Sequence, residues 1–217
     1  MKSTLLSCSI RKVRKKPRSS RIIQIIKELG GKINLLRKIR NPRPFQVLIT
    51  DFTRIHFSFG CLKLILYVDL ASKRITGWFL DRQENTKSAL KAWQKTKRYL
   101  QRMKVNFNQV IVHQDQGSPF TSYEYVNTLT KDNVALSYSQ EGFKENQEME
   151  SVNGHFKEEY KFFFSKAKNI KQARRIISQC IRDWNRKRLH SSIGYQSPDQ
   201  FLHTYFSRYQ RANSKNG

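Results

Sequence analysis

The chain has 217 residues, enough for one well-packed core with a small appendage. Its 42 Lys and Arg residues against 16 Asp and Glu give a formal net charge of +26, which predicts a polyanionic partner, with nucleic acid ahead of a membrane surface. No stretch approaches the roughly 20 apolar residues of a membrane-spanning helix, and three widely spaced cysteines without zinc-type spacing indicate reduced thiols in a cytosolic setting.

Residues 1–44 are expected to form a basic N-terminal arm with a short helix over residues 22–29 and a proline-marked linker. Like charges at the density of residues 11–18 repel one another and resist packing, so a solvated tail and a DNA-contacting arm are compatible interpretations. An organellar transit peptide is the lesser alternative. The DNA contacts predicted for the arm are Arg11, Lys12, Arg14, Lys15 and Lys16.

The following pattern predicts five strands and four helices. The first three strands, which would form an antiparallel meander, are expected at Phe45–Thr53, Leu62–Leu70 and Ile75–Leu80. The elements after them are a helix at Thr86–Met103, a strand at Val110–Gln114, a helix at Ser122–Asp132, a short strand at Val134–Leu136, and helices at Asn146–Tyr160 and Ile170–Arg188. This order predicts an α/β fold, a sheet with helices on both faces.

Three acidic residues stand in settings that suggest a metal site. Asp51 lies inside a β-branched, aromatic strand, and Asp115 follows an apolar strand, which places it at the rim of the sheet. Glu150 lies on a helix whose one face also carries Asn146, Asn153 and Lys157. Three converging carboxylates suit two magnesium ions about 3.5–4 Å apart. Taken singly, each acid is better explained as an ordinary turn, edge or solvated residue, and the catalytic interpretation depends on spacing and context together.

The spacing of these acids resembles that of a known family. Asp115 and Glu150 are separated by 35 positions, and Asp51 precedes them on a strand, which resembles the Asp-Asp-35-Glu signature of the integrase-core superfamily of bacterial insertion-sequence transposases and retroviral integrases. The similarity covers about residues 45–202. Further matching motifs are Thr50-Asp51-Phe52-Thr53, His113-Gln114-Asp115-Gln116-Gly117-Ser118, Trp184-Asn185, Arg188, His190-Ser191-Ser192-Ile193-Gly194-Tyr195 and Ser197-Pro198.

The resemblance implies a ribonuclease H-like fold built on a mixed five-stranded sheet with helices on both faces. It also implies an enzyme that cleaves DNA 3′ ends and transfers the strands at insertion-sequence ends. Residues 45–165 would be the catalytic core, and residues 166–217 a C-terminal helix and basic tail packed on it. Asp51, Asp115 and Glu150 would hold two Mg²⁺ or Mn²⁺ ions. Asn146, Asn153 and Lys157 would contact the terminal DNA.

The implied partners are transposon-end and target DNA, further copies of the chain assembled on DNA, and a DNA-binding product of an upstream reading frame, with action on the nucleoid in the cytoplasm. Departures from the family pattern are Leu48, Arg54 and Glu145, and none removes a carboxylate. Two alternatives stay open. One is a non-catalytic DNA-binding remnant. The other is a ribonuclease H-like nuclease, for which the sequence offers no fourth acid at an evident position.

Overall fold

The computed structural model describes residues 34–139 and 147–213. Six residues predicted to contact DNA lie outside the described residues, as does the helix expected over residues 22–29. The six are Arg11, Lys12, Arg14, Lys15, Lys16 and Asn146.

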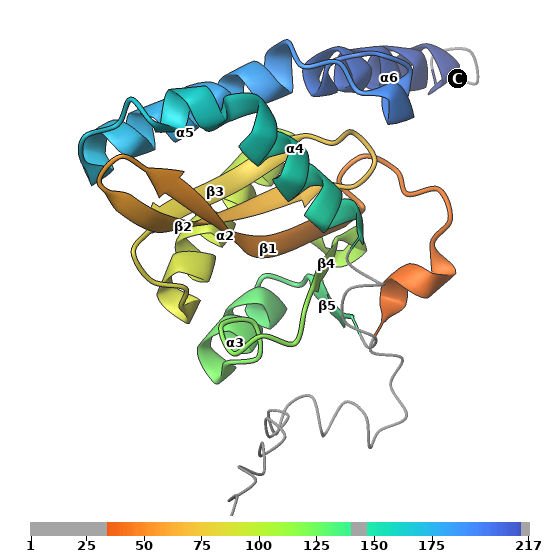
Figure 1. Ribbon diagram of the computed structural model, residues 1–217. Helices are drawn as coiled ribbons and strands as arrows, with labels where there is room; N and C mark the ends of the chain where they lie inside the picture. The colour runs from red at the N-terminus through yellow and green to blue at the C-terminus, as the bar shows by residue number, and fades with distance from the viewer. Residues whose placement is uncertain (1–33, 140–146, 214–217) are drawn as a thin grey trace, which may run out of the picture.

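A mixed sheet of five strands forms the centre of the protein (Figure 1). Its strands are β1 (Val47–Phe57), β2 (Gly60–Asp69), β3 (Ile75–Asp81), β4 (Ile111–Gln114) and β5 (Ala135–Tyr138). They lie in the order β3-β2-β1-β4-β5, with β1, β2 and β3 antiparallel and with β4 parallel to both β1 and β5. This arrangement confirms the predicted ribonuclease H-like fold class.

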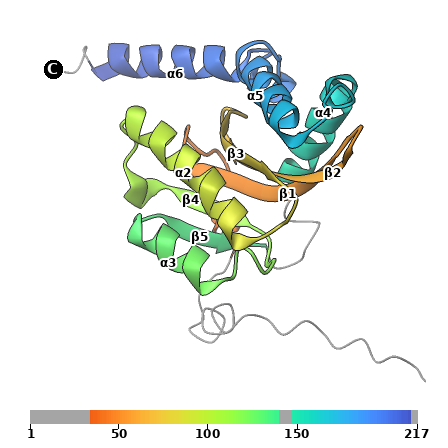
Figure 2. The same ribbon diagram turned by 90° about the vertical axis from the view of Figure 1, so that its left-hand side faces the viewer.

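Helices cover both faces of this sheet, as Figure 2 shows. One face carries α2 (Thr86–Arg102) and α3 (Tyr123–Lys131), and the other carries α4 (Gln147–Phe164) and α5 (Ile170–Arg186). Because successive side chains of a strand point to opposite faces, β1 contributes Ile49 and Ile55 to the core beneath α4 and α5, and Leu48 to the core beneath α2. Short 3-10 turns occur at Leu35–Lys38, Phe107–Gln109 and Ser191–Ile193.

A helix occupies the place of the expected basic tail. Pro198 begins α6 (Pro198–Asn213), consistent with the preference of proline for the first turn of a helix. Leu202 is buried, and the ring of Phe206 stacks on Phe45 with centroids 6.2 Å apart. An ion pair between Asp199 and Arg74 adds a further contact. Residues that we expected to be a basic tail therefore form a helix packed on the core.

The Trp184-Asn185 motif on α5 holds the turn between β2 and β3. The Trp184 indole nitrogen donates to the carbonyl of Lys73 over 3.0 Å. The Asn185 amide pairs with the backbone N–H and C=O of Ile75, both at 2.9 Å, as a neighbouring strand would. A side chain thus satisfies backbone groups at the edge of the sheet, so this part of the family signature has a structural role here.

None of the helices within the described residues is long and apolar enough to cross a membrane.

Candidate active site

Asp51 and Asp115 come from neighbouring parallel strands. Ile49 of β1 lies opposite His113 of β4. Asp51 stands two residues further along β1, and Asp115 stands two residues further along the chain, just past the end of β4. The same register therefore brings the two carboxylates together at the carboxyl end of β4. Both side chains are half-buried. The structure thus brings together the two acids that the sequence placed on separate strands.

Burial and mutual repulsion disfavour the charged form of these carboxyl groups. Burial, and next the negative charge of Asp115, raises the pKa of Asp51 to about 7, although the N–H of Phe52 donates to it over 2.7 Å. Burial also raises the pKa of Asp115, against a hydrogen bond of 2.9 Å from the N–H of Gly117. A bound cation would relieve this repulsion, so the pair fits a divalent metal ion.

Glu150 lies in the first turn of α4 and is exposed. Its charge contributes to the raised pKa of Asp51, but less than Asp115 does. Within residues 34–139 and 147–213, no three His, Cys, Asp or Glu side chains are grouped closely enough to hold a metal ion. The third predicted carboxylate therefore stands apart from the aspartate pair.

Asn153 differs from the expectation that it shares a DNA-facing surface with Glu150 and Lys157. Its side chain is only 5% exposed, and its amide nitrogen lies 3.5 Å from a carboxylate oxygen of Asp51. Lys157, one turn further along α4, is exposed. Asn153 therefore turns inward toward Asp51, because it lies beside the buried Val152 and Phe156 that dock α4 on the sheet.

Glu84 is an acid that sequence reasoning did not single out. It lies in the turn between β3 and α2, where it is exposed and forms a 3.0 Å ion pair with Lys63. Its charge helps to raise the pKa of both Asp51 and Asp115. A fourth acid therefore acts on the pair, from a position that the sequence did not make evident. Exposed turn residues follow no hydrophobic period, so the sequence held no signal for this approach.

The two histidines of the matching motifs lie outside this constellation. His113 is buried in β4, and its Nδ1 lies 2.9 Å from the hydroxyl of Ser137 on β5. His190 packs edge-on against Trp184, with ring centroids 4.9 Å apart, and its Nδ1 lies 2.8 Å from the guanidinium of Arg188. Both contacts tie each histidine to neighbouring parts of the fold.

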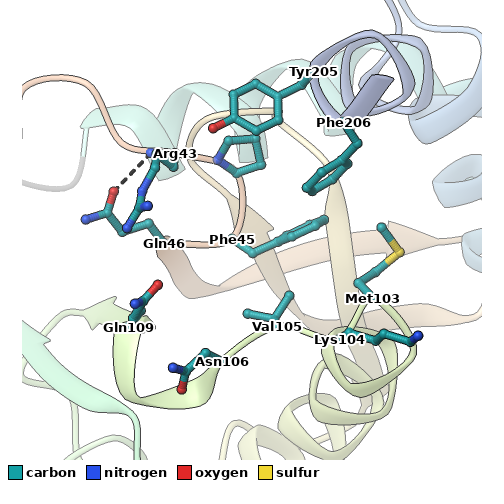
Figure 3. A pocket seen from close by; sticks show the side chains of 11 residues that line it. Arg43, Phe45, Gln46, Met103, Lys104, Val105, Asn106, Gln109, Tyr205 and Phe206 are labelled. Carbon is teal, nitrogen blue, oxygen red and sulfur yellow. Dashed lines mark hydrogen bonds between the residues drawn. The ribbon is translucent and has the colours of Figure 1, made fainter. Parts of the chain in front are cut away.

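A pocket of about 320 Å³ lies at the other end of the same strands (Figure 3). Phe45 and Gln46, just before β1, and Gln109, just before β4, line it together with Tyr205 and Phe206 of α6. Asp115 follows the opposite end of β4. The pocket is therefore separate from the aspartate pair.

Comparison with known proteins identifies the family. A model of the integrase core domain matches residues 41–143, and a second integrase core domain model matches residues 133–198. The chain belongs to the integrase-core family. Among its integrase-core relatives, the transposase for insertion sequence element IS904 of Lactococcus lactis subsp. lactis is 30% identical over 175 residues, which are 77% of this chain and 66% of that protein.

A second integrase-core relative is transposase InsF of insertion sequence IS3fB of Escherichia coli K12. It is 32% identical over 168 residues, which are 73% of this chain and 54% of that protein. The chain thus spans between about half and about two thirds of the length of these relatives.

Solved integrases share the fold. The catalytic core domain of HTLV-2 integrase, solved in complex with magnesium, superposes with a TM-score of 0.59 at 16% identity over 76% of this chain and 99% of that one. The simian T-cell lymphotropic virus intasome chain gives 0.64 at 16% identity, over 76% of this chain and 57% of that one. At these identities the likeness establishes the integrase-core fold alone.

The raised pKa of Asp51 makes stability depend on pH. Between about pH 4 and pH 7 the folded protein holds a proton that the unfolded chain releases, so this group favours the folded state most below pH 4 and progressively less up to pH 7. We expect Asp51→Asn to raise the free energy of unfolding by on the order of 2 kcal/mol at pH 8 and to change it little at pH 4.

Urea unfolding without divalent metal, at both pH values, measures this difference. An equal effect at pH 4 and pH 8 would contradict the assignment of a raised pKa. Added Mg²⁺ should reduce the advantage of the variant, because a bound cation stabilises the charged wild-type carboxylate.

Proposed function

We propose that this chain catalyses metal-dependent cleavage of DNA 3′ ends and strand transfer at the ends of an insertion sequence. The observation that carries the proposal is that Asp51 on β1 and Asp115, just past the end of the adjoining parallel strand β4, lie close enough for one charge to act on the other. Glu150 lies in the first turn of α4, the helix whose Asn153 contacts Asp51. Membership of the integrase-core family and a net charge of +26 support DNA as the substrate.

Asp51, Asp115 and Glu150 would hold two Mg²⁺ or Mn²⁺ ions. Such ions, when bound, supply a more reactive attacking oxygen and a stabilised leaving oxygen. Asn153 would orient the Asp51 carboxylate from its buried position on α4. The exposed Lys157 would bind a phosphate of the terminal DNA, and Asn146 and the basic run of residues 11–18 would add further DNA contacts.

The proposal extends to the assembly. Residues 45–165 would act as the catalytic core, preceded by the basic arm and followed by the α5–α6 unit. Several copies would assemble on DNA, together with the DNA-binding product of an upstream reading frame, on the bacterial nucleoid. The activity would require that assembly if the chain alone does not hold both DNA ends.

Glu84 favours one second candidate, a ribonuclease H-like nuclease with four carboxylates. Its charge acts on both aspartates, although it is paired with Lys63. The two functions differ in their products: a transposase joins a DNA 3′ end to another strand, whereas the nuclease hydrolyses RNA paired with DNA and joins nothing.

The test compares two neighbouring glutamates of α4, both exposed. We expect Glu150→Gln to lower end cleavage and strand transfer by on the order of 10²-fold or more, and Glu148→Gln to retain activity within a few-fold, because only Glu150 is proposed to hold metal. The substrates are labelled oligonucleotides that carry the terminal sequences of the insertion sequence next to the gene for this chain. Cleavage and strand transfer are both measured with Mg²⁺, with Mn²⁺ and with chelator.

End cleavage or strand transfer that persists in chelator, or that Glu150→Gln leaves intact, would contradict the proposed metal site. Hydrolysis of RNA–DNA hybrids without strand joining would replace the transposase by the nuclease. Binding of the ends without any metal-dependent cleavage, in the presence of the upstream product, would favour the non-catalytic remnant.

A further inference from the structure

A stripe of positive charge runs along α2. The helix carries six basic residues and no acidic one. Five of the basic residues recur every three or four positions, which places them on one face of the helix over about 22 Å. We call them the α2 stripe: Lys87, Lys91, Lys95, Arg98 and Arg102. The sixth, Lys97, lies off this face and pairs with Asp132. Figure 2 shows α2 running across the near side of the molecule.

The α2 stripe lacks ion-pair partners within the described part of the chain. None of its five cations forms an ion pair with a carboxylate among the described residues, whereas Lys63, Lys73 and Lys97 all do. Like charges one turn apart destabilise an isolated helix. The neighbouring Arg98 and Arg174 add to burial in lowering the pKa of Lys95. The stripe therefore works against local stability, which points to a use outside the helix.

Aromatic rings of the edge strand β3 hold part of the stripe in place. The Lys95 ammonium lies 3.8 Å from the ring centre of Trp78, and the Lys91 ammonium lies 4.6 Å from that of Phe79. Arg174 of α5 lies 5.4 Å from the same Phe79 ring and donates to the carbonyl of Leu80. These contacts fix cations from two helices on one surface without neutralising them.

A groove of about 780 Å³ runs between α2 and β3. Its walls are Thr76, Gly77 and Trp78 on one side and Lys95, Arg98, Gln101 and Arg102 on the other. Asp51, Leu66 and Trp78 are partners across the sheet, so Trp78 and Asp51 lie about 10 Å apart at two strand spacings. The backbone at the rim of the groove therefore lies two strands away from that of Asp51.

The α2 stripe does not fit an ordinary solvated face, protection of an edge strand or a self-paired interface. A solvated helix face needs no run of one sign, and edge protection of β3 needs one or two charges on the strand itself. Pairing with a second copy through the same face would set the stripe against itself, because a two-fold interface is self-complementary. Duplex DNA, with one negative charge per 3.4 Å of each strand, matches five cations spread over about 22 Å.

We infer that the α2 stripe and the adjoining groove bind the sugar-phosphate backbone of duplex DNA, as a surface additional to the carboxylate site. The inference rests on the proposed function for the choice of DNA as the polyanion. Backbone contacts carry no base readout. The stripe therefore strengthens binding to any duplex and leaves the preference for the element's ends unchanged.

The test removes three exposed cations of the stripe at once in Lys87→Gln/Arg98→Gln/Arg102→Gln. At about 0.15 M salt we expect affinity for duplex DNA to fall about 10- to 100-fold, and the slope of log affinity against log salt to become shallower by about 2–3. Fluorescence anisotropy with end-sequence and scrambled duplexes, in chelator, measures both quantities. The ratio of the affinity for the end-sequence duplex to that for the scrambled duplex should stay within two-fold of the wild-type ratio.

The matched control removes the same amount of charge from exposed lysines elsewhere, in Lys131→Gln/Lys168→Gln/Lys187→Gln. We expect its DNA affinity to stay within about two-fold of wild type. Equal losses in the two variants would reduce the stripe to bulk charge and overturn the inference. A stripe variant whose salt slope equals that of wild type would also overturn the inference. If that variant in addition changes its oligomeric state in analytical sedimentation, the face instead contacts a second copy of the chain.

The measurement is independent of the proposed chemistry. DNA binding is measured in chelator, without metal-dependent cleavage. If wild type never cleaves DNA but the stripe variant binds DNA more weakly than wild type, the proposed function is refuted and the DNA-binding surface is supported. If wild type cleaves DNA with metal but the stripe variant binds DNA as tightly as wild type does, the proposed function is supported and the DNA-binding surface is refuted.

Discussion

Asp115→Asn is expected to lower the rate of DNA-end cleavage by on the order of 10³-fold or more. The substitution keeps the shape of the side chain and the acceptor for the Gly117 N–H at 2.9 Å, but it removes one of the three carboxylate charges proposed to hold metal. DNA affinity in chelator should stay equal or become slightly tighter, because a negative charge facing a polyanion is lost. The measurement is single-turnover cleavage of a labelled end with Mg²⁺.

Two variants make this result specific. Asp51→Asn should be as harmful, and the double variant little worse than either single one, since residues that act as a unit are not additive. Glu84→Gln is the matched control, because Glu84 influences the same aspartates without being proposed to hold metal. We expect it to cost less than about ten-fold. A loss as large as that of Asp115→Asn would instead place Glu84 in the metal site and favour the four-carboxylate nuclease.

The aspartate pair was predictable because its position follows from strand pattern. An apolar run that ends in an acid and a glycine predicts a strand with its carboxylate at the rim, and neighbouring parallel strands present their carboxyl ends at one edge. The helical spacing of Met149, Val152, Phe156 and Tyr160 likewise marks the face of α4 that docks on the sheet, and all four are buried. Period and burial are local properties of the chain.

The remaining features depend on where elements meet. Helical spacing assigns Asn153 to the face of Glu150 and Lys157, but the packing of α4 on the sheet buries Asn153 beside Asp51. Glu84 acts on the two aspartates from the turn before α2, far from both in the sequence. α6 carries Phe201, Leu202, Tyr205 and Phe206 at helical spacing, but the basic composition around them favoured a tail. Tertiary packing determines the positions of these residues. The local hydrophobic periodicity of a single sequence does not reveal which elements will contact one another.

The largest loss of stability is expected from Gly77→Ala. Gly77 lies on β3 directly beneath α2, and an added Cβ would lie 2.6 Å from the carbonyl oxygen of Ala92 and 2.7 Å from the backbone nitrogen of Thr96, in addition to a closer clash with the Thr96 hydroxyl. Backbone atoms of a helix cannot step aside singly, so α2 must lift from the sheet. We expect the free energy of unfolding to fall by about 3 kcal/mol or more.

Gly154→Ala is the matched control, because it adds the same methyl group where nothing lies within 4 Å. Gly154 lies within α4 and is exposed, so the alanine should raise the free energy of unfolding by up to about 1 kcal/mol through helix propensity. Urea unfolding of the two variants should therefore give changes of opposite sign. Thr96→Ala, added to Gly77→Ala, should recover only part of the loss, since it removes the hydroxyl clash and leaves the two backbone contacts. Full recovery would show that the side chain alone limits the approach of α2, and an unchanged stability of Gly77→Ala would contradict the close packing itself.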